Sequence, residues 1–107
     1  GELYTWGNNQ YGQRGVGHTE AVLSPVRLPK PDGLGDWAEL ASSGVHVLAA
    51  DSSGRLFSWG ANDGGQLGLG DRSGRLVPTP VGLPEGVAVV THVAAGEWGV
   101  SAATTAD

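Results

Sequence analysis

The chain has 107 residues, and its 11 acidic and 6 basic side chains give a net charge of −5. This charge argues against a nucleic-acid-binding protein, which needs clustered lysine and arginine to neutralise phosphates. Cysteine is absent, which excludes disulfide bonds, thiolate catalysis and cysteine-based zinc sites.

The first element is a glycine-rich motif, residues 1–17, which the chain repeats at residues 54–70. At a shift of 53 residues, nine of the 17 positions are identical. A second pair of similar segments follows: SPVRLP (residues 24–29) resembles TPVGLP (residues 79–84). Self-similarity at such a period is typical of repeat architectures.

The middle of the chain predicts four short strands. Residues 37–43 and 45–51 are short and mostly apolar, which indicates buried strands. Residues 55–60 alternate and are rich in aromatics, which favours a third strand. Residues 61–71 hold four glycines and predict a compact loop, and residues 79–84 predict an outer strand bounded by prolines. Four short strands in about 50 residues is the pattern of a propeller blade.

The last segment, residues 93–107, weakly repeats residues 40–54, with one extra residue in its middle. We therefore expect two repeats, residues 1–53 and residues 54–107. No segment has a sustained helical period, and no apolar stretch approaches the roughly 18 residues of a membrane-spanning helix. We expect no contact with a membrane.

The shared motif resembles the repeat of the regulator of chromosome condensation family. Its signature positions in the two copies are Trp6, Gly7, Gly12, Gln13 and Gly15, and Trp59, Gly60, Gly65, Gln66 and Gly68. The resemblance implies a seven-bladed β-propeller fold. Two positions depart from the family pattern: Arg14 replaces the usual leucine that Leu67 keeps, and Val100 fills a position where the family usually has histidine.

In the strand order of that family, residues 2–6 and 24–28 are the outer strands of one blade. Residues 37–83 supply a whole blade, and residues 90–105 supply the inner strands of a third. The predicted fold class is all-β, with β-propeller blades of four antiparallel strands arranged as a half blade, a full blade and a half blade. Each end exposes an unpaired strand edge, so more chain or head-to-tail oligomerisation would complete the blades. A homotrimer would have six blades and a homotetramer eight.

Catalytic chemistry has little support in the sequence. His18, His46 and His92 lack neighbours at the spacing of metal ligands, and Asp63 and Asp71 do not follow an EF-hand pattern. The glycine loop precedes no helix that could face a phosphate. We therefore expect a protein that is not an enzyme and that binds no metal or cofactor.

Candidate partner-binding residues lie in the strand turns. Glu97 and Trp98 occupy the turn that carries the extra residue, and an aromatic beside an acid is typical of an interface hot spot. Val45 and His46 follow the corresponding turn of the first repeat and join this set, although the resemblance assigns His46 a structural strand position. We expect Trp6 and Trp59 to pack blade against blade.

The main functional hypothesis is a protein–protein interaction scaffold, including a self-assembling ring unit whose partner is another copy. Guanine nucleotide exchange on a small GTPase is an alternative that the resemblance implies. It uses a hairpin inserted between strands, and the long connections here, residues 30–36 and 70–78, are short for that role. A secreted protein inhibitor is a further alternative. The composition favours a bacterial source, and the compartment stays open between cytoplasmic, slightly favoured, and secreted.

Overall fold

The computed structural model describes residues 1–87, 89–97 and 99–106, which form eight strands and no helix. The strands are β1 (Tyr4–Gly7), β2 (Val22–Arg27), β3 (Trp37–Ser42), β4 (His46–Asp51), β5 (Leu56–Gly60), β6 (Arg75–Pro80), β7 (Val90–Gly96) and β8 (Val100–Thr105). They form a β1–β2 pair, a four-stranded sheet in the order β3–β4–β5–β6, and a β7–β8 pair. All pairs are antiparallel, as predicted.

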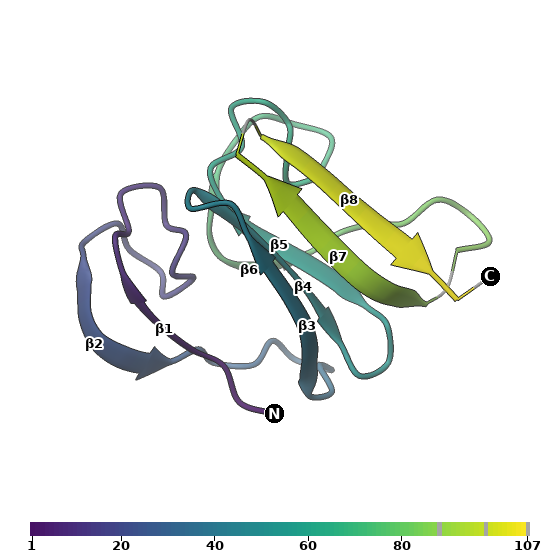
Figure 1. Cartoon of the computed structure of the whole chain (residues 1–107), viewed down its shortest axis with the longest axis horizontal. Helices are drawn as coiled ribbons and strands as arrows, with labels where there is room; N and C mark the ends of the chain where they lie inside the picture. Colours follow the sequence, from purple (N-terminus) through teal and green to yellow (C-terminus); the bar gives the residue numbers. More distant parts are fainter. Residues whose placement is uncertain (88, 98, 107) are drawn as a thin grey trace.

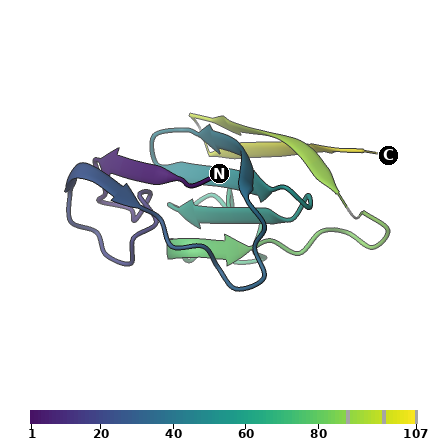
Figure 2. The ribbon, with the colours of Figure 1, turned by 90° about the horizontal axis from the view of Figure 1, so that it is seen from below.

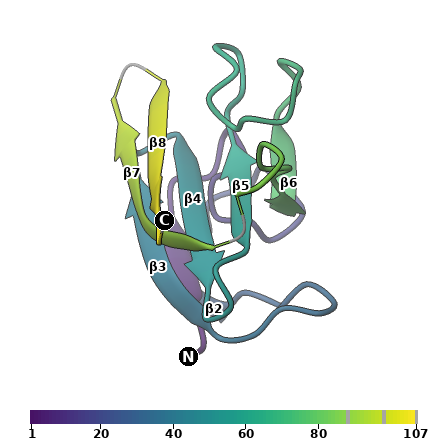
Figure 3. The same cartoon turned by 90° about the vertical axis from the view of Figure 1, so that its right-hand side faces the viewer.

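The two hairpins lie on opposite sides of the central sheet (Figures 1 and 2). Figure 3 shows the β7–β8 hairpin beside β3 and β4, two strands of the central sheet that β7 packs against. All residues of β4 and β5 are buried, because these strands are paired on both sides and covered by neighbouring elements. The arrangement is the half, whole and half blade that the sequence predicts.

The fourth strand of the central sheet was predicted at residues 79–84, and this placement is wrong by four residues. The outer strand β6 is Arg75–Pro80, and β2 likewise begins at Val22 rather than at residue 24. In β1–β2, Thr5 lies opposite Val26. In β5–β6, Ser58 lies opposite Thr79, which is the same register at a shift of 53.

The prediction placed this strand by the similarity of SPVRLP to TPVGLP. These two segments are 55 residues apart, whereas the paired strands repeat at a shift of 53. Register in a hairpin is set by the length of its connecting loop, and both glycine loops close at the same length. The proline rings of β6 are tolerated because this strand is the edge of its sheet.

Two apolar clusters join the blades. The first joins the β1–β2 hairpin to the central sheet and contains Leu28, Val47, Ala49, Phe57 and Trp59, with Trp37 packed against it. The Trp37 ring meets Phe57 edge to face at 5.5 Å between ring centroids. The second cluster joins the central sheet to β7 and contains Ala50, Leu56 and Val90.

The two signature tryptophans differ in their surroundings. Trp59 is fully buried in the first cluster, whereas Trp6 is 56% exposed. The expectation that both pack between blades is therefore wrong for Trp6 within this chain. Within the described residues its strand β1 pairs only with β2, whereas β5 pairs with β4 and β6, so Trp6 lacks the inner strands that cover Trp59.

Candidate protein-binding face

A buried asparagine closes each glycine loop. Asn9 donates its side-chain amide to the carbonyls of His18 and Glu20, both at 2.8 Å, and its Oδ1 accepts the Arg14 N–H at 3.0 Å. Asn62 makes the corresponding bonds in the second loop. Sequence reasoning assigned these residues no role, although their identity in both copies, three residues after the tryptophan, was a usable signal.

Each of the signature glycines has a positive φ. They are Gly7, Gly12, Gly15, Gly60, Gly65 and Gly68. At Gly60 there is also no room for a side chain, because an added Cβ would lie 2.5 Å from the carbonyl oxygen of Val45. The repeated glycines thus fix the loop shape and its close approach to the adjacent turn.

The signature glutamines position the loops and are both buried. Gln13 accepts the Tyr11 N–H at 2.9 Å and donates to the Gly44 carbonyl at 3.0 Å, which ties the first loop to the β3–β4 turn. Gln66 accepts the Gly64 N–H at 2.9 Å in the same way. These bonds bring the loops and the hairpin turns together at one end of the molecule.

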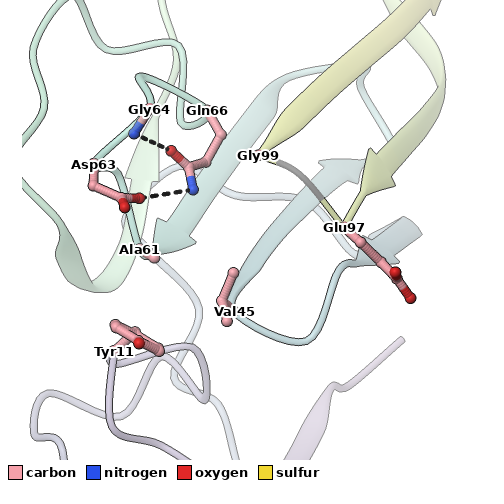
Figure 4. A pocket seen from close by; sticks show the side chains of 8 residues that line it. All are labelled: Tyr11, Val45, Ala61, Asp63, Gly64, Gln66, Glu97 and Gly99. Carbon is pink, nitrogen blue, oxygen red and sulfur yellow. Dashed lines mark hydrogen bonds between the residues drawn. The ribbon is translucent and has the colours of Figure 1, made fainter.

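A pocket of about 340 Å³ opens at this end. Its lining is Tyr11, Val45, Ala61, Asp63, Gly64, Gln66, Glu97 and Gly99. Figure 4 shows Asp63 and Gln66 held together by a hydrogen bond, with the Glu97 side chain directed away from the other lining residues. The structure therefore brings two predicted partner-binding residues, Val45 and Glu97, to one pocket. We call Tyr11, Val45, Asp63 and Glu97 the turn face.

His46 is not part of the turn face, because its side chain is fully buried. Its Nδ1 lies 2.7 Å from Ser43 Oγ and its Nε2 lies 2.9 Å from Ser101 Oγ. Ser101 Oγ donates to the Gln66 carbonyl at 2.6 Å, so the imidazole links β4 to β8 and to the second glycine loop. Burial lowers the pKa of His46, which favours the neutral ring. Its placement among the partner-contacting residues is corrected to a structural one.

The Ser43–His46 pair does not form a catalytic arrangement. Ser43 Oγ also accepts the N–H groups of Val45 and His46, and the far side of the imidazole meets a serine hydroxyl where a catalytic triad has a carboxylate. Within residues 1–87, 89–97 and 99–106, no group of three or more His, Asp or Glu side chains could hold a metal ion. The described part of the chain also has no helix that could cross a membrane.

Trp98, the central residue of the predicted hot spot, lies outside the described residues. Its neighbour Glu97 is exposed. The role of this turn in partner binding stays a prediction.

Arg14 stands where the family pattern has leucine, and this substitution changes the packing of the first glycine loop. Leu67 is 1% exposed in the second loop, whereas Arg14 occupies the same place in the first. Arg14 donates through Nη1 to the Trp6 carbonyl at 2.9 Å, but its Nε is buried and has no hydrogen-bond partner among the described residues. Burial lowers the pKa of this guanidinium.

Comparison with known protein families shows to which family the chain belongs. The model for the regulator of chromosome condensation (RCC1) repeat matches the chain twice, at residues 1–50 and 53–103. The chain belongs to the RCC1 repeat family. The probable E3 ubiquitin-protein ligase HERC3 of Homo sapiens is 39% identical over 98 residues, which are 91% of this chain and 9% of HERC3. The ultraviolet-B receptor UVR8 of Arabidopsis thaliana is 42% identical over 81 residues, which are 76% of this chain and 18% of the receptor.

Solved structures give the same fold. Human WBSCR16 superposes with a TM-score of 0.83 and 31% identity over 99% of this chain and 26% of that protein. Prp20p of Saccharomyces cerevisiae superposes with a TM-score of 0.77 and 29% identity over 98% of this chain and 27% of Prp20p. The structural neighbours are RCC1-type β-propellers, so the predicted fold class is confirmed. The four relatives named here are eukaryotic proteins, and they lend the predicted bacterial source no support.

Proposed function

We propose that this chain is a non-catalytic propeller module that binds a partner protein through the turn face. The observation that carries the proposal is the meeting of two glycine loops and two hairpin turns around one open pocket. Bonds from buried asparagines and glutamines fix these loops, so the face is preorganised for binding. The solved structure of Prp20p is described with its binding properties to Gsp1p and histones, which supports a protein partner.

The chemistry of the turn face selects the kind of partner. Tyr11 is 45% exposed and offers an aromatic surface beside Val45. Asp63 and Glu97 add carboxylates, and the chain carries a net charge of −5. Such a surface fits a partner segment with an apolar side chain next to a lysine or arginine, and the negative field would speed its association at low salt.

The test is binding by substituted chains. Tyr11→Ala should weaken binding of a purified partner by about tenfold or more, as expected for an aromatic interface anchor. Leu23→Ala is the control, because Leu23 is 92% exposed on β2 and does not line the pocket of the turn face. Isothermal titration calorimetry with both variants checks the proposal. Loss of binding in Leu23→Ala together with full binding in Tyr11→Ala would refute it.

A regulator of a small GTPase is the second candidate. It is favoured by the likeness to Prp20p, whose described partner Gsp1p would be the model for this activity. The connections between β2 and β3 and between β5 and β6 hold no paired strands within the described residues, so neither connection carries an inserted hairpin. Release of labelled nucleotide from a purified GTPase, with and without the chain, tests this candidate.

A second copy of the chain is a further partner that we infer. In the part of the chain that the structure describes, strand β1 pairs only with β2, and strand β8 pairs only with β7. Joining β8 of one copy to β1 of the next would rebuild a four-stranded blade and remove both open edges. Each repeat, residues 1–53 and 54–107, then contributes one blade equivalent, and three or four copies would close a head-to-tail ring.

A further inference from the structure

Another pocket, of about 370 Å³, opens between the outer strands of two neighbouring blades. One wall comes from β2 and the other from β6, which is the edge strand of the central sheet. The first glycine loop and the connection from β2 to β3 supply the rest of the lining. None of these residues lines the pocket of the turn face. We call this pocket the rim groove.

The rim groove is built mainly from valine side chains and proline rings, namely Val16, Val26, Val77, Pro29, Pro31 and Pro78. Val26 and Val77 are exposed, so the groove presents apolar surface to solvent. Proline has a fixed φ, which limits the motion of the walls. The Gly17 N–H donates to the Leu76 carbonyl at 2.9 Å and holds the first glycine loop against β6. Binding therefore costs little free energy for ordering the groove.

Two basic side chains line the rim groove, Arg27 on β2 and Lys30 in the connection that follows it. Its lining, taken over the described residues, includes no acidic side chain. These are two of only six basic residues in a chain whose net charge is −5. The repeat does not account for them, because at a shift of 53 the second copy has Pro80 and Leu83 in their places. The rim groove is thus an apolar site with a basic edge.

Both cations already have acidic neighbours outside the lining of the groove. Arg27 lies 3.5 Å from Glu2, and Lys30 lies 2.9 Å from Asp36 and 4.0 Å from Glu2. Exposed ion pairs contribute little to stability, so a partner carboxylate can join or replace these acids at small cost. The Arg27 guanidinium has five N–H donors and directs Nη1 to Glu2, which leaves donors for a second carboxylate.

We propose that the rim groove binds an acidic peptide segment of a partner protein. A leucine-sized side chain of this segment packs between the valines and prolines, and a neighbouring aspartate or glutamate pairs with Arg27 and Lys30. The charge of the groove selects an acidic segment, whereas the turn face fits a basic one. The proposal goes beyond the proposed function and does not depend on it, because the two surfaces share no lining residue.

Fluorescence anisotropy with synthetic peptides tests the proposal. The probe is a short peptide with two adjacent leucines between aspartates, labelled with an uncharged dye. One matched peptide has lysines in place of the aspartates, and another has serines in place of the leucines. The probe should bind about tenfold or more tightly than either matched peptide, because it alone satisfies both the apolar walls and the cations.

Substitutions in the groove locate the binding site. Arg27→Glu should weaken binding of the probe by about fivefold or more, since it reverses a charge beside the peptide. Arg72→Glu is the matched control, because Arg72 is an exposed arginine that does not line the groove, and it should bind the probe like the wild type. Val77→Asp should weaken binding by about tenfold or more, because it places a carboxylate in the apolar wall.

A further variant separates the rim groove from the turn face. Tyr11→Ala should bind the probe like the wild type, since Tyr11 lines only the other pocket of the two. Circular dichroism shows whether each variant keeps the fold. A probe that binds no more tightly than its lysine counterpart would overturn the proposal. Folded Arg27→Glu and Val77→Asp variants that bind like the wild type, or loss of binding in Tyr11→Ala, would also overturn it.

Discussion

The two copies of the glycine motif have the same local structure and different surroundings. Asn9 and Asn62 make the same three bonds, and the hairpins that flank the loops have the same register. Yet Trp59 is fully buried and Trp6 is 56% exposed. The motif therefore determines the loop and the hairpin by itself, whereas burial of its tryptophan depends on the strands of the adjacent blade.

The largest expected difference between the copies is at the tryptophans. Trp59→Ala removes a buried ring and its hydrogen bond, and should reduce the free energy of unfolding by about 3–5 kcal/mol. Trp6→Ala at low concentration should change it by about 0.5 kcal/mol or less, as for other surface positions. Urea denaturation followed by circular dichroism measures both. Equal costs would mean that Trp6 is packed as Trp59 is.

The asparagines should behave alike where the tryptophans differ. Asn62→Ala leaves the buried Leu67 N–H without its acceptor and removes the amide donor to the Asp71 and Ser73 carbonyls, which should cost about 2 kcal/mol. Asn9→Ala should cost a similar amount, because the bonds are the same. The exposed Asn8 is the control, and Asn8→Ala should be close to neutral. An Asn9→Ala cost near zero would show that the first loop is held by other contacts.

Asp51 makes the central sheet sensitive to acid. Burial raises the pKa of its carboxyl, but hydrogen bonds from the Arg55 and Gly35 N–H groups and from Ser53 outweigh this and lower the pKa below its ordinary value. The stabilisation is thus complete above the ordinary pKa and is lost as the pH falls through the lowered one. Asp51→Asn should cost about 1–2 kcal/mol at neutral pH.

The same variant should also flatten the dependence of unfolding on acidic pH. Thermal unfolding of the wild type and of Asp51→Asn between neutral pH and about pH 3, below the ordinary aspartate pKa near 3.9, measures this. An identical pH dependence in the two proteins would assign the acid sensitivity to other carboxylates.

The smallest expected effect is at Arg14. Arg14→Leu installs the residue that Leu67 provides in the second copy, and it removes a buried Nε that has no partner among the described residues. We expect a gain of about 0.5–1 kcal/mol in the free energy of unfolding, because an unsatisfied buried donor is lost. A loss would show that the hydrogen bond from Arg14 to the Trp6 carbonyl matters more than the buried nitrogen.

Sequence reasoning predicted the antiparallel sheets and the division into half, whole and half blades, because these follow from short-range strand patterns and the repeat. It misplaced the fourth strand because the similar segments SPVRLP and TPVGLP are 55 residues apart, whereas the strands repeat at a shift of 53. The length of the glycine loop sets this register. It grouped His46 with exposed residues because burial depends on Ser101, which is 55 residues away. It named Val45 and Glu97 as partner contacts, which stays a prediction, and it did not name Tyr11, because the pocket that these residues line forms only when the loops and turns meet.

The central claim is that the strands of an adjacent blade decide whether the signature tryptophan is buried, as they do for Trp59 and do not for Trp6. Fluorine NMR of the chain with fluorinated tryptophan tests it directly, with Trp6→Phe used to assign the Trp6 signal. The Trp6 resonance should shift when the solvent is changed from H2O to D2O, as expected for an exposed ring, while the Trp59 resonance stays constant. Equal solvent shifts of the two resonances would contradict the claim.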